Sequence, residues 1–345
     1  DYEISTYVGS SAGSLVGLFF AAGFRPHDVV EMFVNPKTSR IPPISYKDML
    51  SLKRVRAPSE KPLFDPLRGL PFYAKQIIKP FFKISGLFTT AGLHEYIKKN
   101  IIQSDNFRDF KADLFVVATQ LDHSRKVIFG KYKYPNPQHY STAFYYVDLP
   151  VSDSVAASMS VPPMFSPYPI WNTKKKEVDY YIDGEIRETL STHVAIDNQC
   201  ELVISSWTHT PYHYHDEIGS LINYGLPAII LQSIHLMIQK KIVDSRARRK
   251  TAADIVDTVN DYLHRNKFSD RHRRQLLAIL ETKLHYSSKI HLIDIFPTHD
   301  NYKFFFKNSF TLDPSVNMEV VTAGYKRTME VFRNQEWEAW LHLLY

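Results

Sequence analysis

A serine between glycines near the start of the chain has the spacing of a catalytic nucleophile. The motif Gly9-Ser10-Ser11-Ala12-Gly13 follows a β-branched and aromatic segment over residues 4–8 and precedes a helix-forming run over residues 14–22. A strand, a sharp turn and a helix are the context in which a G-x-S-x-G pattern holds a serine hydroxyl near the positive end of a helix. The pattern also fits a turn that only joins a strand to a helix. A phosphate-binding loop is disfavoured, because the segment lacks the lysine that contacts phosphates.

A serine hydroxyl needs a base to accept its proton, and two arrangements are open. A Ser-His-Asp triad would use one of several histidines, none of which is marked by its sequence context: His193, His209, His213, His215 and His299. A Ser-Asp dyad would use Asp183, which ends a predicted strand over residues 178–182 and precedes Gly184. A partly desolvated carboxylate beside a hydroxyl can act as a general base without histidine. An Asp-Gly pair after a strand is also a common turn, so the residues alone leave both arrangements open.

Strands and helices alternate as far as about residue 206, a pattern typical of an α/β layered domain. The continuous apolar run over residues 114–118 is expected to be a strand buried on both faces. The other predicted strands of this region cover residues 4–8, 126–129, 145–147, 178–182 and 202–204. From residue 216 onward the apolar spacing is that of amphipathic helices. We expect these helices over residues 219–242, 252–265, 270–286, 314–333 and 335–344, with a strand over residues 290–295.

The composition is that of a globular protein with a substantial core. The 345 residues are 44% hydrophobic, carry a net charge of +6 and include one cysteine, Cys200. A single cysteine excludes an internal disulfide and a cysteine-rich metal site, and it is compatible with a reducing compartment. The longest apolar run, over residues 226–238, is interrupted by Pro227, Gln232 and His235 and is shorter than the ~18 residues of a membrane span. We therefore expect no transmembrane segment, and no signal peptide is visible.

Two further features each allow two interpretations. The excursion over residues 35–80 contains eight prolines and short predicted helices over residues 46–51 and 72–78. It is either a solvated loop or a lid that faces a membrane. The basic clusters over residues 246–250 and 271–274 are either solvated helix faces or contacts for anionic lipid.

Four separated segments resemble the patatin-like phospholipase family. They are the Gly9–Gly13 elbow, the Ala112–Asp122 strand segment with its A-T-x-L end, the Ala157–Pro162 block, and Ile182-Asp183-Gly184, which is similar to the family's D-G-[GA] block. The segments follow one another in the family's order between residue 4 and about residue 206. The helical remainder is compatible with the family but less specific.

The resemblance implies a patatin-like three-layer α/β fold with a central, mostly parallel sheet. It implies a catalytic core over residues 1–206 and a mainly helical extension over residues 207–345 that packs on the core. In the implied mechanism Ser11 attacks an ester carbonyl to form an acyl-enzyme, while Asp183 accepts the proton and later activates water. The N–H of Ala12 is the implied oxyanion donor. Gly9 and Gly13 shape the elbow, and Gly184 and Pro162 support the motif assignment.

The implied activity is that of a lipid acyl hydrolase, of the phospholipase A or lipase type, acting on glycerolipid esters at a membrane surface. A Ser-Asp dyad needs no cofactor or metal ion, and the carboxylate spacing of a calcium loop is missing. We expect no nucleic-acid partner and leave open a protein partner or activator. The sequence leaves the location of the protein open, and it is compatible with a cytoplasmic or peripheral membrane location.

The chain departs from the family pattern at two points. Glu185 stands where the family has glycine or alanine, which adds a carboxylate beside the base. The family's glycine-rich oxyanion segment would precede the elbow, so we expect the natural protein to begin upstream of Asp1. A catalytically weak patatin-like module that binds lipid or a protein partner is therefore an alternative. A second alternative is an α/β-hydrolase-type esterase that uses a histidine.

Overall fold

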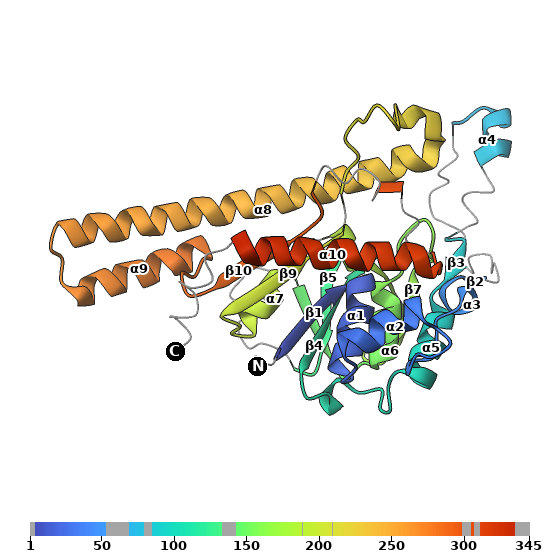
Figure 1. Cartoon of the computed structure of the whole chain (residues 1–345), viewed down its shortest axis with the longest axis horizontal. Coiled ribbons are helices and arrows are strands. Elements are labelled where there is room, and N and C mark those ends of the chain that lie inside the picture. Colours follow the sequence, from blue (N-terminus) through green and yellow to red (C-terminus); the bar gives the residue numbers. More distant parts are fainter. Residues whose placement is uncertain are drawn as a thin grey trace. The chain divides into compact units, whose positions relative to one another are not determined.

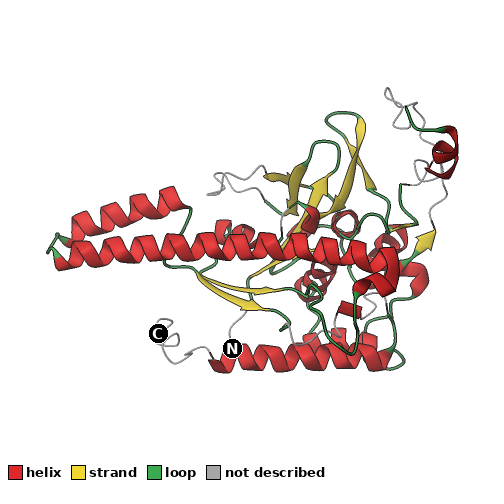
Figure 2. Ribbon diagram, turned by 90° about the horizontal axis from the view of Figure 1, so that it is seen from above, coloured by secondary structure: helices red, strands yellow, loops and turns green. Residues whose placement is uncertain are grey.

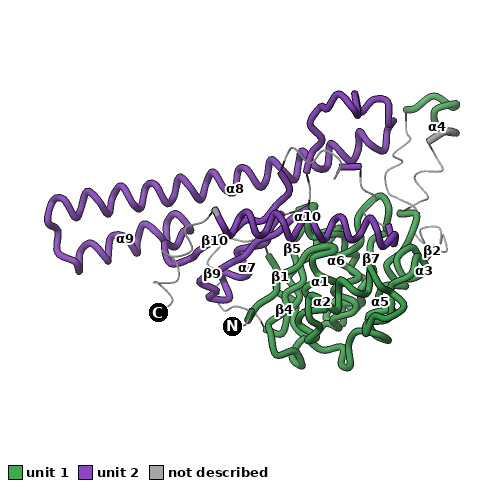
Figure 3. The backbone as a smooth tube through the Cα atoms, viewed as in Figure 1, with its two compact units in different colours: residues 1–133, 142–187 green, residues 134–141, 188–345 purple. Residues whose placement is uncertain are grey.

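The fold is described from a computed structural model of the chain (Figure 1). The description covers residues 4–52, 69–78, 85–132, 143–187, 189–208, 210–298, 305–306 and 311–334. The predicted helix over residues 335–344, His209, His299 and much of the proline-rich excursion lie outside these residues. The chain divides into two compact units, residues 1–133 with 142–187 and residues 134–141 with 188–345 (Figure 3).

The first unit holds a mixed sheet with helices between its strands. Its sheet strands are β1 (Thr6–Ser10), β4 (Asp113–Gln120), β5 (Arg125–Gly130), β6 (Ala143–Val147), β7 (Tyr168–Asn172) and β8 (Glu177–Asp183). A short pair is formed by β2 (Ser51–Leu52) and β3 (Phe88–Thr89). The helices are α1 (Ala12–Ala21), α2 (Pro26–Val34), α3 (Tyr46–Met49), α4 (Phe72–Ile78), α5 (Ala91–Asn100) and α6 (Val151–Ser158). Short 3-10 turns are η2 (Phe107–Asp109) and η3 (Gly184–Ile186).

Strand β4 is the centre of the sheet and is buried along almost its whole length, as its continuous apolar run predicts. Helices α1 and α6 both pack against β4 and also contact each other, so they lie on the same face of the sheet. The pairings β1–β4 and β5–β6 are parallel, whereas β4–β5, β4–β8 and β7–β8 are antiparallel. The expected α/β class is confirmed, but the expectation of a mostly parallel sheet is wrong. The reason is that β4–β5 and β7–β8 are joined by turns too short for a parallel crossover.

Strands β1 and β8 approach the same edge of β4 from opposite directions. Ser10, the last residue of β1, pairs with Val117, and Asp183, the last residue of β8, pairs with the next residue, Ala118. Because β1 runs parallel to β4 and β8 runs antiparallel to it, their carboxyl ends meet. This topology brings the turn after β1 next to Asp183.

The second unit is mainly helical. It contains α7 (Thr192–Asp197), β9 (Leu202–Ser206), η4 (Leu221–Tyr224), α8 (Gly225–Arg265), α9 (Asp270–Leu284), β10 (His291–Ile295) and α10 (Pro314–Asn334). Strands β9 and β10 pair in parallel, so β9 belongs with this unit although the predicted core extends to residue 206. Helices α8 and α9 run antiparallel and pack on each other as a long hairpin (Figure 2).

The prediction of two separate helices over residues 219–242 and 252–265 is wrong, because the single helix α8 covers most of both ranges. It is continuous for 41 residues, because the segment between the predicted helices contains neither proline nor glycine and includes three arginines and a lysine, which favour a helix.

By length and composition, the segment Leu221–Arg265 is also apolar enough to cross a membrane. Its most apolar 18-residue window has a mean hydropathy of 1.5, and 6% of that window is buried. A count of uninterrupted apolar residues does not find this segment, because isolated polar residues end the run although the mean hydropathy of the window stays high.

Candidate active site

Ser11 occupies the turn between β1 and α1 in a conformation that serine rarely adopts. Its φ of 52° and ψ of −133° lie outside the helical and extended regions. A non-glycine residue held in such a region costs on the order of 1–3 kcal/mol and persists only where the surrounding structure imposes it. Ser11 is half-buried, whereas Ala12 and Gly13 are exposed. The turn therefore presents the serine at the tip of a strand–helix elbow, as its motif predicts.

Buried serines hold the backbone of this turn in place. The N–H of Ser11 donates to Ser158 Oγ over 2.9 Å, and Ser158 Oγ donates to the carbonyl oxygen of Val117 on β4 over 2.6 Å. On the other side, Ser14 Oγ donates to the carbonyl oxygen of Ser11 over 2.6 Å. Ser158 is fully buried at the end of α6. It links the elbow to the central strand, so it is a positioning residue that the sequence analysis quoted within a motif but did not assign.

The glycines of the two motifs differ in how strongly the structure requires them. A Cβ atom on Gly9 would lie 2.5 Å from Ser14 Cα, so no side chain fits there. A Cβ atom on Gly184 would lie 2.5 Å from Ser10 Oγ and from the carbonyl oxygen of Val117. Gly13 faces open space, so its position beside the turn is not set by close packing, contrary to our expectation for both elbow glycines.

Asp183 lies at the end of β8, where it is almost completely buried, with 2% of its surface exposed. Its carboxylate oxygen Oδ1 accepts a hydrogen bond of 2.8 Å from the N–H of Glu185. Its own N–H donates to the carbonyl oxygen of Ser160 over 3.0 Å. Ser160 belongs to the same block as Ser158 and Pro162, and half-buried Pro162 follows it in the connection to β7. The Ala157–Pro162 block therefore contacts the segments of both Ser11 and Asp183.

The environment of Asp183 raises the pKa of its carboxyl toward neutral pH. Burial raises the pKa of the Asp183 carboxyl from 3.8 to about 6, and the nearby Ser11 hydroxyl, the Glu185 N–H and the Ser10 hydroxyl each lower that pKa in part. The Ser11 hydroxyl is the strongest of the three opposing groups, so the serine and the carboxylate are within interaction range. Glu185 acts on Asp183 through its backbone N–H, which favours the ionised form of Asp183.

The described histidines that could have served as the base belong to the other unit. His193, His213 and His215 belong to the second unit, whereas Ser11 and Asp183 belong to the first.

Among the described residues, His123, Glu177 and Asp179 have ligand atoms within 4.8 Å of one another, a spacing that could hold a metal ion. The ammonium group of Lys175 lies 3.1 Å from His123 Nε2 and 3.2 Å from Glu177 Oε1 and already supplies a positive charge there. Asp179 Oδ2 accepts a hydrogen bond of 2.7 Å from Asn172 Nδ2. These contacts account for the cluster as an interaction between the β7–β8 hairpin and the turn that joins β4 to β5.

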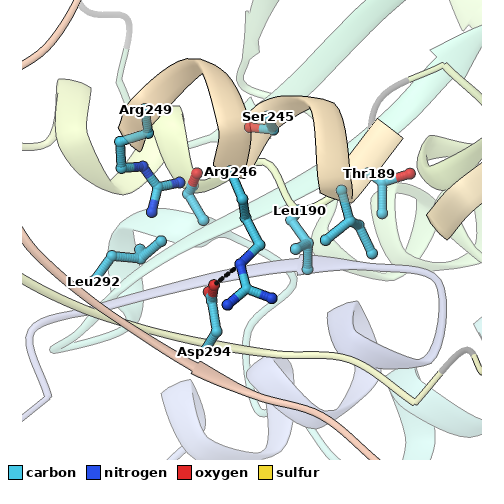
Figure 4. A pocket seen from close by; sticks show the side chains of 9 residues that line it. Thr189, Leu190, Ser245, Arg246, Arg249, Leu292 and Asp294 are labelled. Carbon is cyan, nitrogen blue, oxygen red and sulfur yellow. Dashed lines mark ion pairs between the residues drawn. The ribbon is translucent and has the colours of Figure 1, made fainter. Parts of the chain in front are cut away.

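A small cavity in the second unit is built around an ion pair. Arg246 Nε lies 3.2 Å from Asp294 Oδ2, and Arg249 lies beside this pair (Figure 4). Burial raises the pKa of Asp294 and the two arginines lower it, whereas burial lowers the pKa of Arg249. The cavity joins α8 to β10 and contains neither Ser11 nor Asp183. We interpret it as a structural contact within the second unit.

The first unit combines an α/β sheet, a serine at a strand–helix elbow and a buried carboxyl beside it. This is the class of α/β proteins that includes many ester hydrolases. The family model described as Patatin-like phospholipase matches residues 2–196, which is more than half of the chain. The chain therefore belongs to the patatin-like phospholipase family, whose members are in general lipid acyl hydrolases. Comparison with curated proteins finds no match.

Proposed function

We propose that the protein hydrolyses carboxylic esters of glycerolipids, with Ser11 as the nucleophile and Asp183 as the general base. The observation that carries this proposal is the meeting of a strained, half-buried serine with a buried carboxyl whose pKa is raised to about 6. A base with a pKa near the working pH is ionised and still accepts a proton well. Family membership supports the lipid acyl class of the substrate.

The proposed reaction has two halves. In the first half the Ser11 hydroxyl attacks the ester carbonyl and its proton passes to Asp183. Asp183 then gives this proton to the leaving alcohol as the acyl-enzyme forms. In the second half Asp183 takes a proton from water, which attacks the acyl carbonyl. The bond to Ser11 then breaks, Asp183 returns the proton to Ser11 Oγ, and the fatty acid is released. The first-turn N–H groups of α1 have no intrahelical acceptor, so the N–H of Ala12 is the proposed donor to the negative oxygen. The N–H of Ser11 is already used by Ser158.

We also propose that residues 1–206 form the catalytic core and that residues 207–345 form a helical extension. The support for this division is that Ser11, Ser158 and Asp183, with the sheet that positions them, all precede residue 188.

The experiment compares fatty-acid release from phosphatidylcholine in detergent micelles by the natural chain and by single variants. Ser11→Ala and Asp183→Asn should each reduce the turnover number by at least about 10³-fold, because each removes a group that acts in the transition state. The matched control is Asp179→Asn, which removes another buried carboxyl from β8. This control should keep most of the activity.

Other outcomes would separate the proposal from its rivals. Full activity of Asp183→Asn together with loss of activity after substitution of one histidine would support an esterase that uses histidine. A folded natural chain without activity on any glycerolipid would support a binding module instead. Below about pH 6 the proposed enzyme should lose activity as Asp183 becomes protonated.

A further inference from the structure

The first half of α8 presents apolar side chains to solvent, where a helix of a globular protein normally presents polar ones. The exposed residues include Leu226 at 66% and Met237 at 59% of their surface. Together with the preceding turn η4, the exposed apolar side chains of this segment are Ile222, Tyr224, Leu226, Ile229, Ile230, Leu231, Leu236, Met237 and Val243. Exposed apolar area of this extent marks a surface that binds a partner.

Two polar residues of the same segment, Gln232 and His235, bond to the backbone of the loop before it. The N–H of Tyr212 donates to Gln232 Oε1 over 2.8 Å, and Gln232 Nε2 donates to the carbonyl oxygen of Tyr212 over 2.9 Å. His235 Nδ1 lies 3.1 Å from the carbonyl oxygen of Thr210. These two polar side chains are therefore partnered within the protein, whereas many apolar side chains of this part of α8 face solvent. An apolar partner would fit this exposed face.

Five of the exposed side chains form a band along one face of the helix. Leu226, Ile230 and Met237 follow one another at spacings of four and seven residues, which place them on one face of an α-helix. Ile229 and Leu236 flank them, and we call these five residues the apolar stripe. The buried residues Ile238 and Ile242 lie on the opposite side and pack inward.

Basic residues follow the apolar stripe directly. Between residues 240 and 250, α8 carries six lysines and arginines and one acidic residue, Asp244. Arg246 and Arg249 are turned toward Asp294 (Figure 4), but Arg248 and Lys250 are exposed. Arg248 follows Ile230 by about five helical turns, so it lies on the same face as the apolar stripe. An apolar band continued by exposed positive charge is complementary to acyl chains under anionic headgroups.

From these observations we infer that the apolar stripe and the basic segment after it dock the protein on the surface of a bilayer that contains anionic lipid. This inference rests on the proposed function, to which it adds the element that holds the enzyme at its substrate. The stripe enters the boundary of the acyl chains, and Arg248 and Lys250 contact the headgroups. Docking from one side leaves Gln232 and His235 bonded to their backbone partners, whereas a helix that spans the bilayer would have to release them into hydrocarbon.

The test is vesicle flotation with the Ser11→Ala chain, which cannot consume the lipid by the proposed mechanism. The vesicles are phosphatidylcholine alone, or phosphatidylcholine mixed with phosphatidylglycerol. The test variant replaces Ile230 and Met237 by glutamate, and its matched control replaces the exposed Tyr262 and Ile279 of the same hairpin by glutamate. We expect the test variant to lose at least about tenfold in partition to the mixed vesicles, and the control to bind like the parent chain. Arg248→Gln with Lys250→Gln should remove the preference for the anionic vesicles, as should high salt.

Several results would overturn the inference. They are equal binding of the test variant and the parent chain, absence of binding to both vesicles, or resistance of the bound protein to alkaline extraction, which would indicate a spanning helix. A dimer in solution that the test substitutions dissociate would show that a second copy covers the stripe. A second assay separates a failure of membrane docking from a failure of the proposed hydrolysis. It measures hydrolysis of a soluble short-chain ester by chains that keep Ser11. The test variant should retain this hydrolysis. If the proposed function is wrong, the parent chain will not hydrolyse the ester, but it will still float with the vesicles.

Discussion

Replacing Asp183 by asparagine is expected to make the protein more stable at neutral pH. Burial raises the pKa of Asp183 from 3.8 to about 6 in the folded chain, so the folded state binds this proton more tightly than the unfolded state does. The contribution of Asp183 to stability is therefore complete below about pH 4 and is lost as the pH rises through about 6. Asparagine has nearly the same shape and can still accept the hydrogen bond from the Glu185 N–H, but it does not ionise.

The magnitude follows from the size of the pKa shift. A shift from 3.8 to about 6 corresponds to about 3 kcal/mol, since each pKa unit is worth about 1.4 kcal/mol. The free energy of unfolding of Asp183→Asn, minus that of the natural chain, should thus grow by about 3 kcal/mol between about pH 4 and about pH 8. Other titrating groups are the same in both proteins and cancel in the difference.

The assay is urea unfolding of both proteins across this pH range, followed by circular dichroism. The natural chain should lose stability relative to the variant mainly between about pH 4 and about pH 6. Unfolding curves whose separation does not change with pH would refute the assignment of Asp183 as a buried carboxyl with a raised pKa. They would also remove the reason for treating it as a base that ionises near neutral pH.

Two further substitutions, each with a matched control, test how the backbone of the elbow at Ser11 is held in place. Ser158→Ala should lower the free energy of unfolding by about 1–3 kcal/mol, because it leaves a buried N–H and a buried carbonyl without this partner. The matched control Ser154→Ala removes only a bond to the carbonyl oxygen of Pro150 at the start of α6, and a loss of the same size there would argue against a special role for Ser158. Gly9→Ala should prevent the elbow from closing, because its Cβ atom meets the backbone of the next turn, whereas Gly13→Ala should stabilise α1 by up to about 1 kcal/mol. Urea unfolding checks all four variants, and a larger loss for Gly13→Ala than for Gly9→Ala would contradict the described packing.

The local parts of the site were predictable because their signals lie within a few residues. The β-branched run, the glycine-flanked turn and the small-residue helix around Ser11 predict a strand–helix elbow, and the structure has β1, the turn and α1 at those positions. Asp183 is marked in the same way by the strand before it and by Gly184 after it. What the sequence could not provide is the pairing of β1 and β8 with consecutive residues of β4, since pairing is set by tertiary packing.

Ser158 shows this limit most clearly. Its bond to the Ser11 N–H joins residues that are 147 positions apart. The only signal available was its membership of the Ala157–Pro162 block.

The sheet order and α8 were missed for different reasons. The short segment between the predicted strands at residues 114–118 and 126–129 already excludes a parallel crossover, so the antiparallel pairing of β4 and β5 was open to prediction. The exposure of apolar side chains on the first half of α8 could not be predicted, because a periodic pattern does not say which helix face packs against the protein. Only the exposure of Leu226 and Met237 and the inward bonds of Gln232 reveal it.

The most direct test of the central proposal is labelling by a fluorophosphonate probe, with the adduct located by mass spectrometry. Such probes react with a serine whose hydroxyl is activated by a neighbouring base. The proposal predicts a single adduct on Ser11 in the natural chain and in Ser10→Ala, and no adduct in Ser11→Ala or in folded Asp183→Asn. An adduct on another serine, or undiminished labelling of Asp183→Asn, would contradict it.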